Sequence, residues 1–290
     1  MDLSLFSNSF KVTVDIFQKD TKDLLYNKPT SAVSGFTYKI SNIGSIRNRG
    51  LEITLGGDLS YSDFRWTGDF NIAFVKNRLT SLTDDDDILT TDDYHALKVG
   101  EEVGSFYLIK MLGIYQSDEE VPETLYKEGV RAGDIRYEDV NRDGRIDTVN
   151  DSQFVGSANP LFTGGFSNTF KWRGLDLNIF LTFSYGNQLY QTWTGGLRLG
   201  NGQWPAQRSE ALARWTGPGT SNTVPRAIYG MTWNSTLFKT TRYLHDASYL
   251  RCRSLSLGYS LPSGIMKKAG LESLRAYLQA DNLFLISPYR

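Results

Sequence analysis

The sequence predicts an all-β protein in which about eight antiparallel strands form part of a larger transmembrane β-barrel. The first observation is that apolar and polar residues alternate along several segments of roughly ten residues. The second is that the connections between these segments alternate between short turns and long polar loops. A barrel that crosses a membrane combines both features, because its turns are short on one side and its loops are long on the other.

The alternation is clearest at residues 175–184, where the odd-numbered residues are apolar and most of the even-numbered ones are polar. Successive side chains of a strand point to opposite faces, so this segment has one apolar and one polar face. On this pattern we assign four residues to the inside of the barrel: Asp69, Asn71, Asp176 and Asn178. The pattern and the turn residues together predict strands at about 3–6, 10–20, 43–60, 64–80, 161–172, 175–189, 248–261 and 272–285.

The connections fall into two classes by length. Short links lie near 7–9, 61–63 and 172–174, with a fairly short one at 262–270, so the strands are expected to pair as hairpins. The long, polar connections are 21–42, 82–160 and 190–246. Structureless loops beyond about 15 residues are unusual in compact domains unless they are functional. No linker or fixed repeat interrupts the chain, so we expect no internal domain boundary.

Aromatic residues cluster beside two of the short turns. Tyr61, Phe64 and Trp66 lie at one turn, and Phe170 and Trp172 lie at the other. They fit the aromatic girdle that marks a membrane surface on a barrel. They fit equally well the ordinary aromatic content of β-strands, so both interpretations stay open at this point.

Composition excludes several classes of protein. Nowhere do about 18 apolar residues follow one another, so a transmembrane helix is excluded, whereas barrel strands need only about 10 residues each. With 31 basic and 32 acidic residues the formal net charge is -1, which gives no reason to expect nucleic acid as a partner. The single cysteine, Cys252, allows no internal disulfide. Residues 1–6 lack the features of a signal peptide, so we expect an outer-membrane protein to extend beyond them.

The strongest local motif is an Asp- and Asn-rich stretch that starts as a calcium loop does, with glycine at its sixth position. Calcium takes about six to eight oxygen ligands. An EF-hand closes with glutamate at the twelfth position, which here is Asn150, so Asp151 is the candidate closing ligand. The alternative is an Asx-rich turn that binds nothing. The other expected ligands are the side chains of Asp139, Asn141, Asp143 and Asp147 and the backbone carbonyl of Arg145.

Other polar clusters point to nothing specific. The acidic run Asp84–Asp87, followed by Asp92 and Asp93, is more typical of a solvated loop than of a second ion site. The two histidines, His95 and His245, belong to no recognisable nucleophile elbow, zinc-protease helix or phosphate-binding loop. We therefore expect neither an enzyme nor an organic cofactor.

Five segments, in order along nearly the whole chain, resemble the SusC/RagA-type TonB-dependent transporters of Bacteroidetes. The match rests on their order and spacing together, since each segment alone is only moderately specific. The segments are SNIGSIRNRGLEITL (41–55), VGEEVGSFYLIKMLGIY (99–115), GDIRYEDVNRDGRID (133–147), VGSANPLFTGGFSNTFKWRGLDLNIFLTFSYGNQLY (155–190) and ASYLRCRSLSLGYSLP (247–262).

The resemblance implies a bacterial outer-membrane barrel of about 22 strands with an N-terminal plug. It also implies energy from TonB, a SusD-like surface lipoprotein over the pore, contact with outer-membrane lipid, and import of an oligosaccharide or a peptide. Residues 1–290 would be the C-terminal part of the barrel without the plug. Nothing in them resembles a signal sequence, a TonB box or a plug, and the last residues stop before a closing strand.

Two other architectures remain possible on the residues alone. The first is a secreted, calcium-stabilised β-sandwich that binds glycans through the loop tryptophans Trp193, Trp204 and Trp215. It predicts a closed apolar interior between two sheets. The second is a complete eight-stranded barrel, which predicts that the first and last strands pair with each other.

Overall fold

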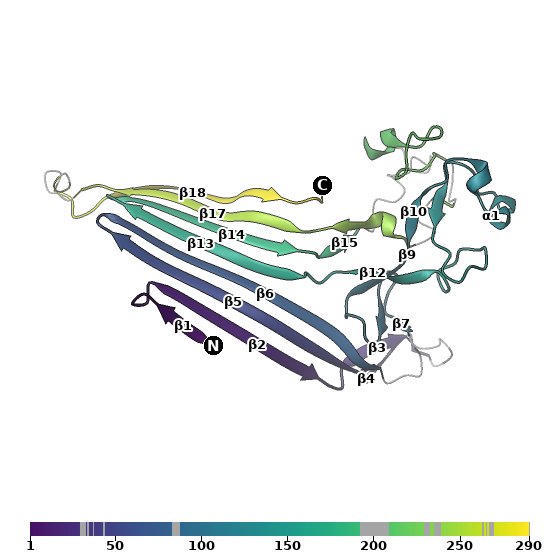
Figure 1. Cartoon of the computed structure of the whole chain (residues 1–290), viewed down its shortest axis with the longest axis horizontal. Helices are drawn as coiled ribbons and strands as arrows, with labels where there is room; N and C mark the ends of the chain where they lie inside the picture. The colour runs from purple at the N-terminus through teal and green to yellow at the C-terminus, as the bar shows by residue number, and fades with distance from the viewer. Residues whose placement is uncertain are drawn as a thin grey trace. The chain divides into compact units, whose positions relative to one another are not determined.

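The computed structural model describes all residues except 30–32, 34, 37, 43, 83–87, 192–208, 229–232, 235–238, 263, 265, 267–269 and 290. The chain forms two compact units (Figure 1). The first comprises Met1–Asp85, Asn159–Asn187 and Asp246–Arg290, and the second comprises Asp86–Ala158 and Gln188–His245. Both are assembled from segments far apart in the sequence, so neither corresponds to one continuous stretch of chain.

The first unit is dominated by an eight-stranded sheet in which every neighbouring pair is antiparallel. The predicted strands are confirmed, and the largest difference is at the end of β14, expected near 189 and found at Tyr185. A separate hairpin consists of β3 (Leu25–Pro29) and β4 (Tyr38–Asn42). In spatial order the sheet contains β1 (Asp2–Leu5), β2 (Phe10–Thr21), β5 (Gly44–Tyr61), β6 (Phe64–Leu82), β13 (Phe162–Trp172), β14 (Leu175–Tyr185), β17 (Tyr249–Ser260) and β18 (Arg275–Ile286).

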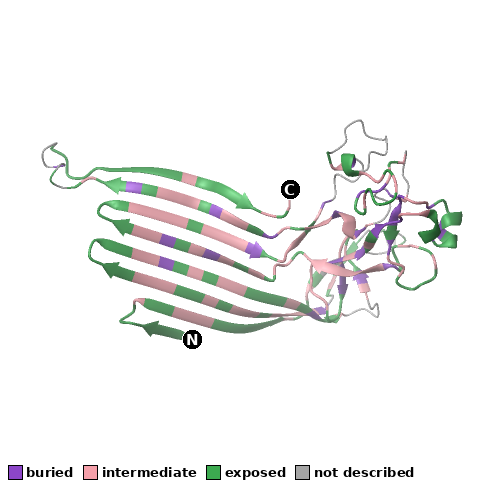
Figure 2. Cartoon of the chain, turned by 45° about the horizontal axis from the view of Figure 1, so that its top comes forward, coloured by how far each residue is buried: buried purple, intermediate pink, exposed green. Residues whose placement is uncertain are grey.

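The register separates an apolar from a polar face of this sheet. One cross-strand row on the apolar face runs through Val12, Leu55, Phe70, Phe166, Leu181 and Cys252. The neighbouring row, on the polar face, runs through Lys11, Gly56, Asp69, Ser167, Phe180, Ser254 and Asp281. Exposed and half-buried residues predominate along the strands (Figure 2), as expected for a sheet whose faces are not covered by a second sheet.

The alternative architectures receive no support from the topology. Every other sheet in the described residues has two strands, so the eight-stranded sheet has no partner sheet of its size and no sandwich core. Its spatial order begins with β1 and ends with β18, and these two strands do not pair in the described part of the chain. The sheet is therefore open, in agreement with part of a larger barrel rather than a closed eight-stranded one.

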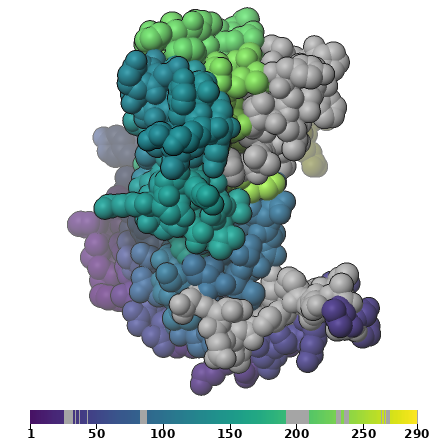
Figure 3. Space-filling view, turned by 90° about the vertical axis from the view of Figure 1, so that its right-hand side faces the viewer, coloured from purple at the N-terminus to yellow at the C-terminus, as the bar shows by residue number. Residues whose placement is uncertain are grey.

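The second unit is built from the long connections 82–160 and 190–246, which were expected only to be polar loops. They carry a core of their own, in which Tyr115, Val121, Leu125 and Val130 form one buried cluster. Figure 3 shows part of the surface of this unit in space-filling form, with its described residues in teal to green. Its strands are β7 (Ile88–Thr90), β8 (Ala96–Lys98), β9 (Ser105–Ile109), β10 (Met111–Ile114), β11 (Ile135–Tyr137), β12 (Ser152–Ser157), β15 (Gln188–Tyr190) and β16 (Leu244–Asp246).

Helix is scarce in both units. The second unit holds a short helix, α1 (Glu123–Lys127), and single 3-10 turns at Asp118–Glu120, Ser209–Ala213 and Thr241–Tyr243. Among the described residues, none of the helices is long and apolar enough to cross a lipid bilayer.

Candidate functional site on the polar face of the sheet

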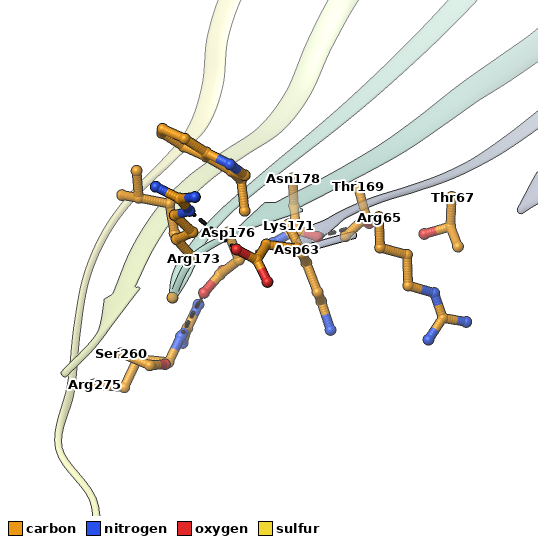
Figure 4. Close-up of a pocket in the computed structure, with 13 residues that line it drawn as sticks. Asp63, Arg65, Thr67, Thr169, Lys171, Arg173, Asp176, Asn178, Ser260 and Arg275 are labelled. Carbon is orange, nitrogen blue, oxygen red and sulfur yellow. Dashed lines mark hydrogen bonds and ion pairs between the residues drawn. The ribbon is translucent and has the colours of Figure 1, made fainter. Parts of the chain in front are cut away.

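The polar face of the sheet is hollowed at its short-turn end into a pocket of about 750 Å³ (Figure 4). Its walls come from β6, β13, β14, β17 and β18 and from the turns that join them. Every second residue of these strands points to this face, which is why most of the lining side chains are polar. The residues that carry its charge and hydrogen-bonding groups include Arg65, Thr169, Lys171, Asp176, Asn178 and Arg275.

The best-defined contact in the pocket joins β14 to β18 across β17. Arg275 Nε lies 3.0 Å from Asp176 Oδ1, and Nη2 lies 2.6 Å from Oδ2, which makes the pair bidentate. Gly258 stands between them as the register partner of Asp176. A Cβ at position 258 would lie 2.4 Å from Arg275 Nη2 and 2.7 Å from Asp176 Oδ1. The pair can form because Gly258 has no side chain.

Two further ion pairs belong to this end of the sheet. Arg65 lies 3.2 Å and 2.7 Å from the two carboxylate oxygens of Asp58, and Arg173 Nε lies 3.0 Å from Asp63 Oδ2. All four side chains are exposed, so solvent screens both ion pairs and they add little to stability. These groups make a solvated, charged surface rather than a stabilising core.

The four residues assigned to the inside of the barrel all lie on the polar face. Asp176 and Asn178 line the pocket, and Asn178 Oδ1 accepts a hydrogen bond of 2.8 Å from the Thr169 hydroxyl. Asp69 and Asn71 lie farther from the short turns, where the alternation of β6 places them on the same face. Such a row of amides and carboxylates can hydrogen-bond water or a polar solute.

The apolar face carries aromatic residues at the same end. Tyr61 is 84% exposed and Trp172 is 51% exposed, while Phe64 is 40% exposed. Trp66 is half-buried, and its indole Nε1 donates a hydrogen bond of 3.0 Å to Asn168 Oδ1. Large exposed aromatics beside the turns fit an interfacial girdle, since their rings suit a boundary between lipid and water.

The predicted calcium loop lies in the second unit and forms hydrogen bonds with itself. Asp139 Oδ2 accepts the backbone N–H of Gly144 at 2.8 Å, and Gly144 has a φ of 78°, as the predicted sharp turn requires. Asn141 Nδ2 donates to Asp143 Oδ2 at 2.9 Å. Asp143 Oδ1 accepts the backbone N–H of Arg145 at 2.8 Å.

Asp151 closes the loop from its far end. Its side chain is 1% exposed, and its two oxygens accept the backbone N–H groups of Val140 at 2.9 Å and Asp147 at 2.7 Å. Hydrogen bonds from the backbone and side chain of Asn150 hold the pKa of Asp147 below the ordinary range of an aspartate. No group of three or more His, Cys, Asp or Glu side chains lies within metal-binding range in the described part of the chain. Calcium binding by this loop stays a prediction.

The second acidic stretch is only partly described. Asp84–Asp87 lie outside the described residues. Burial alone would raise the pKa of Asp92, but hydrogen bonds from the backbone N–H groups of Tyr94 and His95 and from the His95 ring hold that pKa below its ordinary value. Asp93 lies 3.3 Å from the Lys239 ammonium. The described part of this stretch is therefore engaged in local contacts.

Of the three loop tryptophans, Trp193 and Trp204 lie outside the described residues. Trp215 is half-buried, and its Nε1 donates a hydrogen bond of 3.2 Å to Gln116 Oε1. This indole belongs to the packing of the second unit and is not a free stacking surface.

Sequence reasoning missed the buried carboxylate that organises the second unit. Asp134 is 1% exposed and receives Arg226 Nε and Nη2 at 2.7 and 2.9 Å, Asn234 Nδ2 at 2.7 Å and the backbone N–H of Arg131 at 2.8 Å. The bond with Asp134 raises the pKa of Arg226 above its ordinary value. Arg226 and Asn234 follow Asp134 by 92 and 100 residues, so no local pattern signals this cluster.

Comparison with known proteins supports the same architecture. No protein-family model matches the chain. It is similar over 100% of its length to TonB-dependent receptor P3 of Formosa agariphila, at 30% identity and 29% coverage of that protein. It is also similar over 100% of its length to TonB-dependent receptor SusC of Bacteroides thetaiotaomicron, at 24% identity and 28% coverage. The chain thus spans less than a third of the length of these relatives.

A solved structure shares the fold. This chain is similar to the structure of the RagAB peptide transporter, with a TM-score of 0.80 and 23% sequence identity. The similarity covers 99% of this chain and 31% of the transporter chain. That likeness agrees with the open antiparallel sheet and with its separation into apolar and polar faces. It shows that the chain has the fold of part of the β-barrel of the RagAB transporter. The similarity over the whole chain to named TonB-dependent receptors, SusC among them, agrees with this fold.

Proposed function

We propose that the whole protein imports a nutrient, an oligosaccharide or a peptide, across the outer membrane with energy from TonB. The observation that carries this proposal is the sheet with one apolar and one polar face, neither of which a second sheet covers among the residues that the structure describes. In a barrel wall the apolar face meets lipid and the polar face lines a solvated lumen. The names of the relatives support transport as the activity.

The lengths of the connections orient this wall. Short turns lie at one end of the sheet and the chain segments of the second unit connect its strands at the other. Outer-membrane barrels keep their turns short on the periplasmic side and their loops long on the outer side. We therefore infer that the pocket at the short turns faces the periplasm and that the long connections 82–160 and 190–246 leave the strands on the extracellular side.

Uptake measurements test the proposed activity. Cells that lack the gene and cells depleted of TonB are compared with the parent strain for uptake of labelled oligosaccharides and labelled peptides. We expect one substrate class to lose uptake in both strains, which also decides between the two classes. Unchanged uptake of both classes in the deletion strain, or uptake that survives TonB depletion, would refute the proposal.

A surface lipoprotein of the SusD type is the partner that we propose for the whole protein. Support comes from the similarity to SusC and to the RagAB transporter. Affinity purification of the tagged protein from outer membranes, followed by mass spectrometry, should recover such a lipoprotein in stoichiometric amount. Recovery of the receptor alone in mild detergent would contradict this assignment.

We further propose that these residues are the C-terminal part of the barrel and that the plug lies elsewhere in the same polypeptide. The order of the resembling segments supports this assignment. Peptide mapping of the receptor purified from outer membranes tests it, because the peptides of the plug should all precede those of residues 1–290. Plug-like peptides on the other side of this stretch would contradict it.

Calcium remains our proposal for the loop that contains Asp139, Asn141, Asp143, Arg145, Asp147 and Asp151. The donor set supports it, because each carboxylate oxygen of Asp139 and Asp151 accepts one backbone N–H and retains a second lone pair. Calcium at 100 times its Kd should stabilise the protein by about 2.7 kcal/mol. Thermal unfolding with calcium and with a chelator measures this, and Asp143→Ala should abolish the difference. Equal Tm values in both conditions would refute the proposal.

A further inference from the structure

A group of basic residues lies on the apolar face of the sheet, at the end away from the short turns. The cross-strand row Ile16, Leu51 and Phe74 is the last apolar row of β2, β5 and β6 on this face. The next two rows on the same face contain four basic residues, which we call the basic patch: Arg47, Arg49, Lys76 and Arg78.

The basic patch consists of two directly opposed pairs of like charges. β5 and β6 lie side by side (Figure 1), and their register pairs Arg49 with Lys76 and Arg47 with Arg78. Arg49, Lys76 and Arg78 are exposed, and the side chain of Arg47 is 41% exposed. Like charges at directly opposite positions of an antiparallel pair destabilise it. An anion bound between the two rows would remove this repulsion.

One carboxylate shares these rows and compensates part of the charge. Asp20 Oδ1 accepts a hydrogen bond of 2.6 Å from Arg47 Nε, and Arg49 Nε donates one of 2.8 Å to the side-chain oxygen of Gln18. Lys76 and Arg78 form no hydrogen bond or ion pair with any residue that the structure describes. Four basic residues against one carboxylate give these rows a formal charge of +3.

The position along β6 places the basic patch at the edge of the apolar band. Phe74 lies ten residues beyond Phe64, which is about 34 Å along the strand. A strand tilted by about 40° rises about 26 Å over that length, which is close to the height of an apolar band of about 25 Å. Lys76 and Arg78 lie about 5 and 10 Å higher, at the depth of lipid headgroups.

We propose that the basic patch binds the phosphate of an anionic lipid at the extracellular end of the apolar band. This inference rests on the proposed function, because it takes the apolar face to meet lipid and the long connections to lie outside the cell. Arginine suits this ligand, since its guanidinium can bind two phosphate oxygens at once.

The apolar row next to the basic patch favours a lipid over a soluble partner. Ile16 is 82% exposed and Phe74 is 38% exposed, so both side chains offer apolar surface directly beside the charges. The acyl chains of a lipid would cover these side chains while its phosphate lies at the level of Arg49 and Lys76. Free phosphate would leave the apolar row uncovered.

Lipid titration of the full-length receptor, followed by native mass spectrometry, tests the proposal. The probes are phosphatidylglycerol, which carries a net negative charge, and phosphatidylcholine, whose choline neutralises its phosphate. Lys76→Gln combined with Arg78→Gln should weaken binding of the first phosphatidylglycerol by about 25-fold, or about fivefold for each basic residue near an anionic lipid. Binding of phosphatidylcholine should not change.

Two further double variants serve as controls. Lys11→Gln combined with Lys19→Gln removes the same charge from the polar face of β2, where both lysines are exposed, and should leave binding of phosphatidylglycerol unchanged. Lys76→Arg combined with Arg78→Lys keeps the charge of the basic patch and should retain the affinity.

Three results would overturn the proposal: equal losses of affinity in the two double glutamine variants, no loss in the variant of Lys76 and Arg78, or equal affinity of the unchanged receptor for both lipids. Displacement of phosphatidylglycerol by an equal concentration of inorganic phosphate would also overturn it, because the basic patch would then recognise free phosphate. The comparison of the two lipids needs no variant, so it decides even where a variant fails to fold. Substrate uptake can persist in each of these cases, so failure here is distinct from failure of the proposed transport activity.

Discussion

An arginine on the apolar face of β6 should lower the stability of the folded barrel much more than an arginine on the polar face. Phe70 lies on the apolar face, where its ring is 6.2 Å from that of Phe166 and stacks at 6.1 Å on Phe183. Asn71, the next residue, is exposed on the polar face. If the apolar face meets lipid, Phe70→Arg puts a charge into the bilayer, whereas Asn71→Arg puts the same charge into the solvated lumen.

The position of Phe70 along the strand sets the magnitude. It lies six residues beyond Phe64, the first residue of β6, which is about 20 Å along the strand. A strand tilted by about 40° rises about 15 Å over that length, close to the middle of an apolar band about 25 Å tall. Arginine at the midplane costs about 2–4 kcal/mol on the lipid face of a barrel. Asn71→Arg should cost about 0.5 kcal/mol or less.

Reversible unfolding of the full-length receptor in phospholipid vesicles, followed by tryptophan fluorescence, measures both variants. A loss of about 2–4 kcal/mol corresponds to a folding equilibrium constant lower by about 30-fold to several hundred-fold. The reasoning is refuted if Asn71→Arg costs as much as Phe70→Arg, because the two faces would then meet the same environment. A larger cost for Asn71→Arg would invert the assignment of the faces.

Three further predictions follow from single contacts. Gly258→Val should displace the Arg275 guanidinium from Asp176, because a Cβ at position 258 would lie 2.4 Å from Arg275 Nη2; a crystal structure of the variant in which the bidentate pair persists would refute the requirement for glycine. Asp134→Ala should leave Arg226 without its carboxylate and lower the stability of the second unit by about 3–5 kcal/mol. Proteolysis of this unit on intact cells should then be faster, and an unchanged rate of cleavage would contradict the prediction. The pKa of Asp147 is lowered in the folded loop, so the ionised carboxylate stabilises the folded loop. This contribution is complete above about pH 3.9, the ordinary pKa of an aspartate, and is lost as the pH falls through the lowered pKa. The protection of the loop amides, that is, their hydrogen-exchange rates relative to the intrinsic rates at each pH, should fall on acidification across this range, and Asp147→Asn should remove that change in protection.

The strands were predictable because their signal is local. The alternation at 175–184 depends only on which face each residue takes, and a barrel wall between lipid and water imposes that choice at every position. The turns at 61–63 and 172–174 were equally visible, and they fixed which strands pair as hairpins. The pocket was predictable in part, since the same alternation placed Asp176 and Asn178 on the polar face.

The second unit was not predictable because its contacts are not local. Asp134 gains its partners from residues about a hundred positions later, and the backbone N–H of Ile135 donates a hydrogen bond of 2.9 Å to Asn234 Oδ1. In the pocket, the bond between Arg275 and Asp176 likewise crosses an intervening strand and depends on Gly258. The alternation of apolar and polar residues predicts the face of the sheet on which each residue lies. Only the pairing register of the strands shows which residues contact one another on that face.

Asn168 is a polar residue on the apolar face of the sheet, and its contacts explain how that face can accommodate it. Its side chain is 6% exposed, and its amide oxygen accepts the indole N–H of Trp66 at 3.0 Å. Gly57 and Gly68 are register partners beneath that ring, and a Cβ on them would lie 2.6 and 2.5 Å from it. An unpaired polar group facing lipid costs several kcal/mol, so the indole and the amide each need the other. The glycines make room for the ring, the ring satisfies the amide, and the four residues form one structural unit that only the register makes visible.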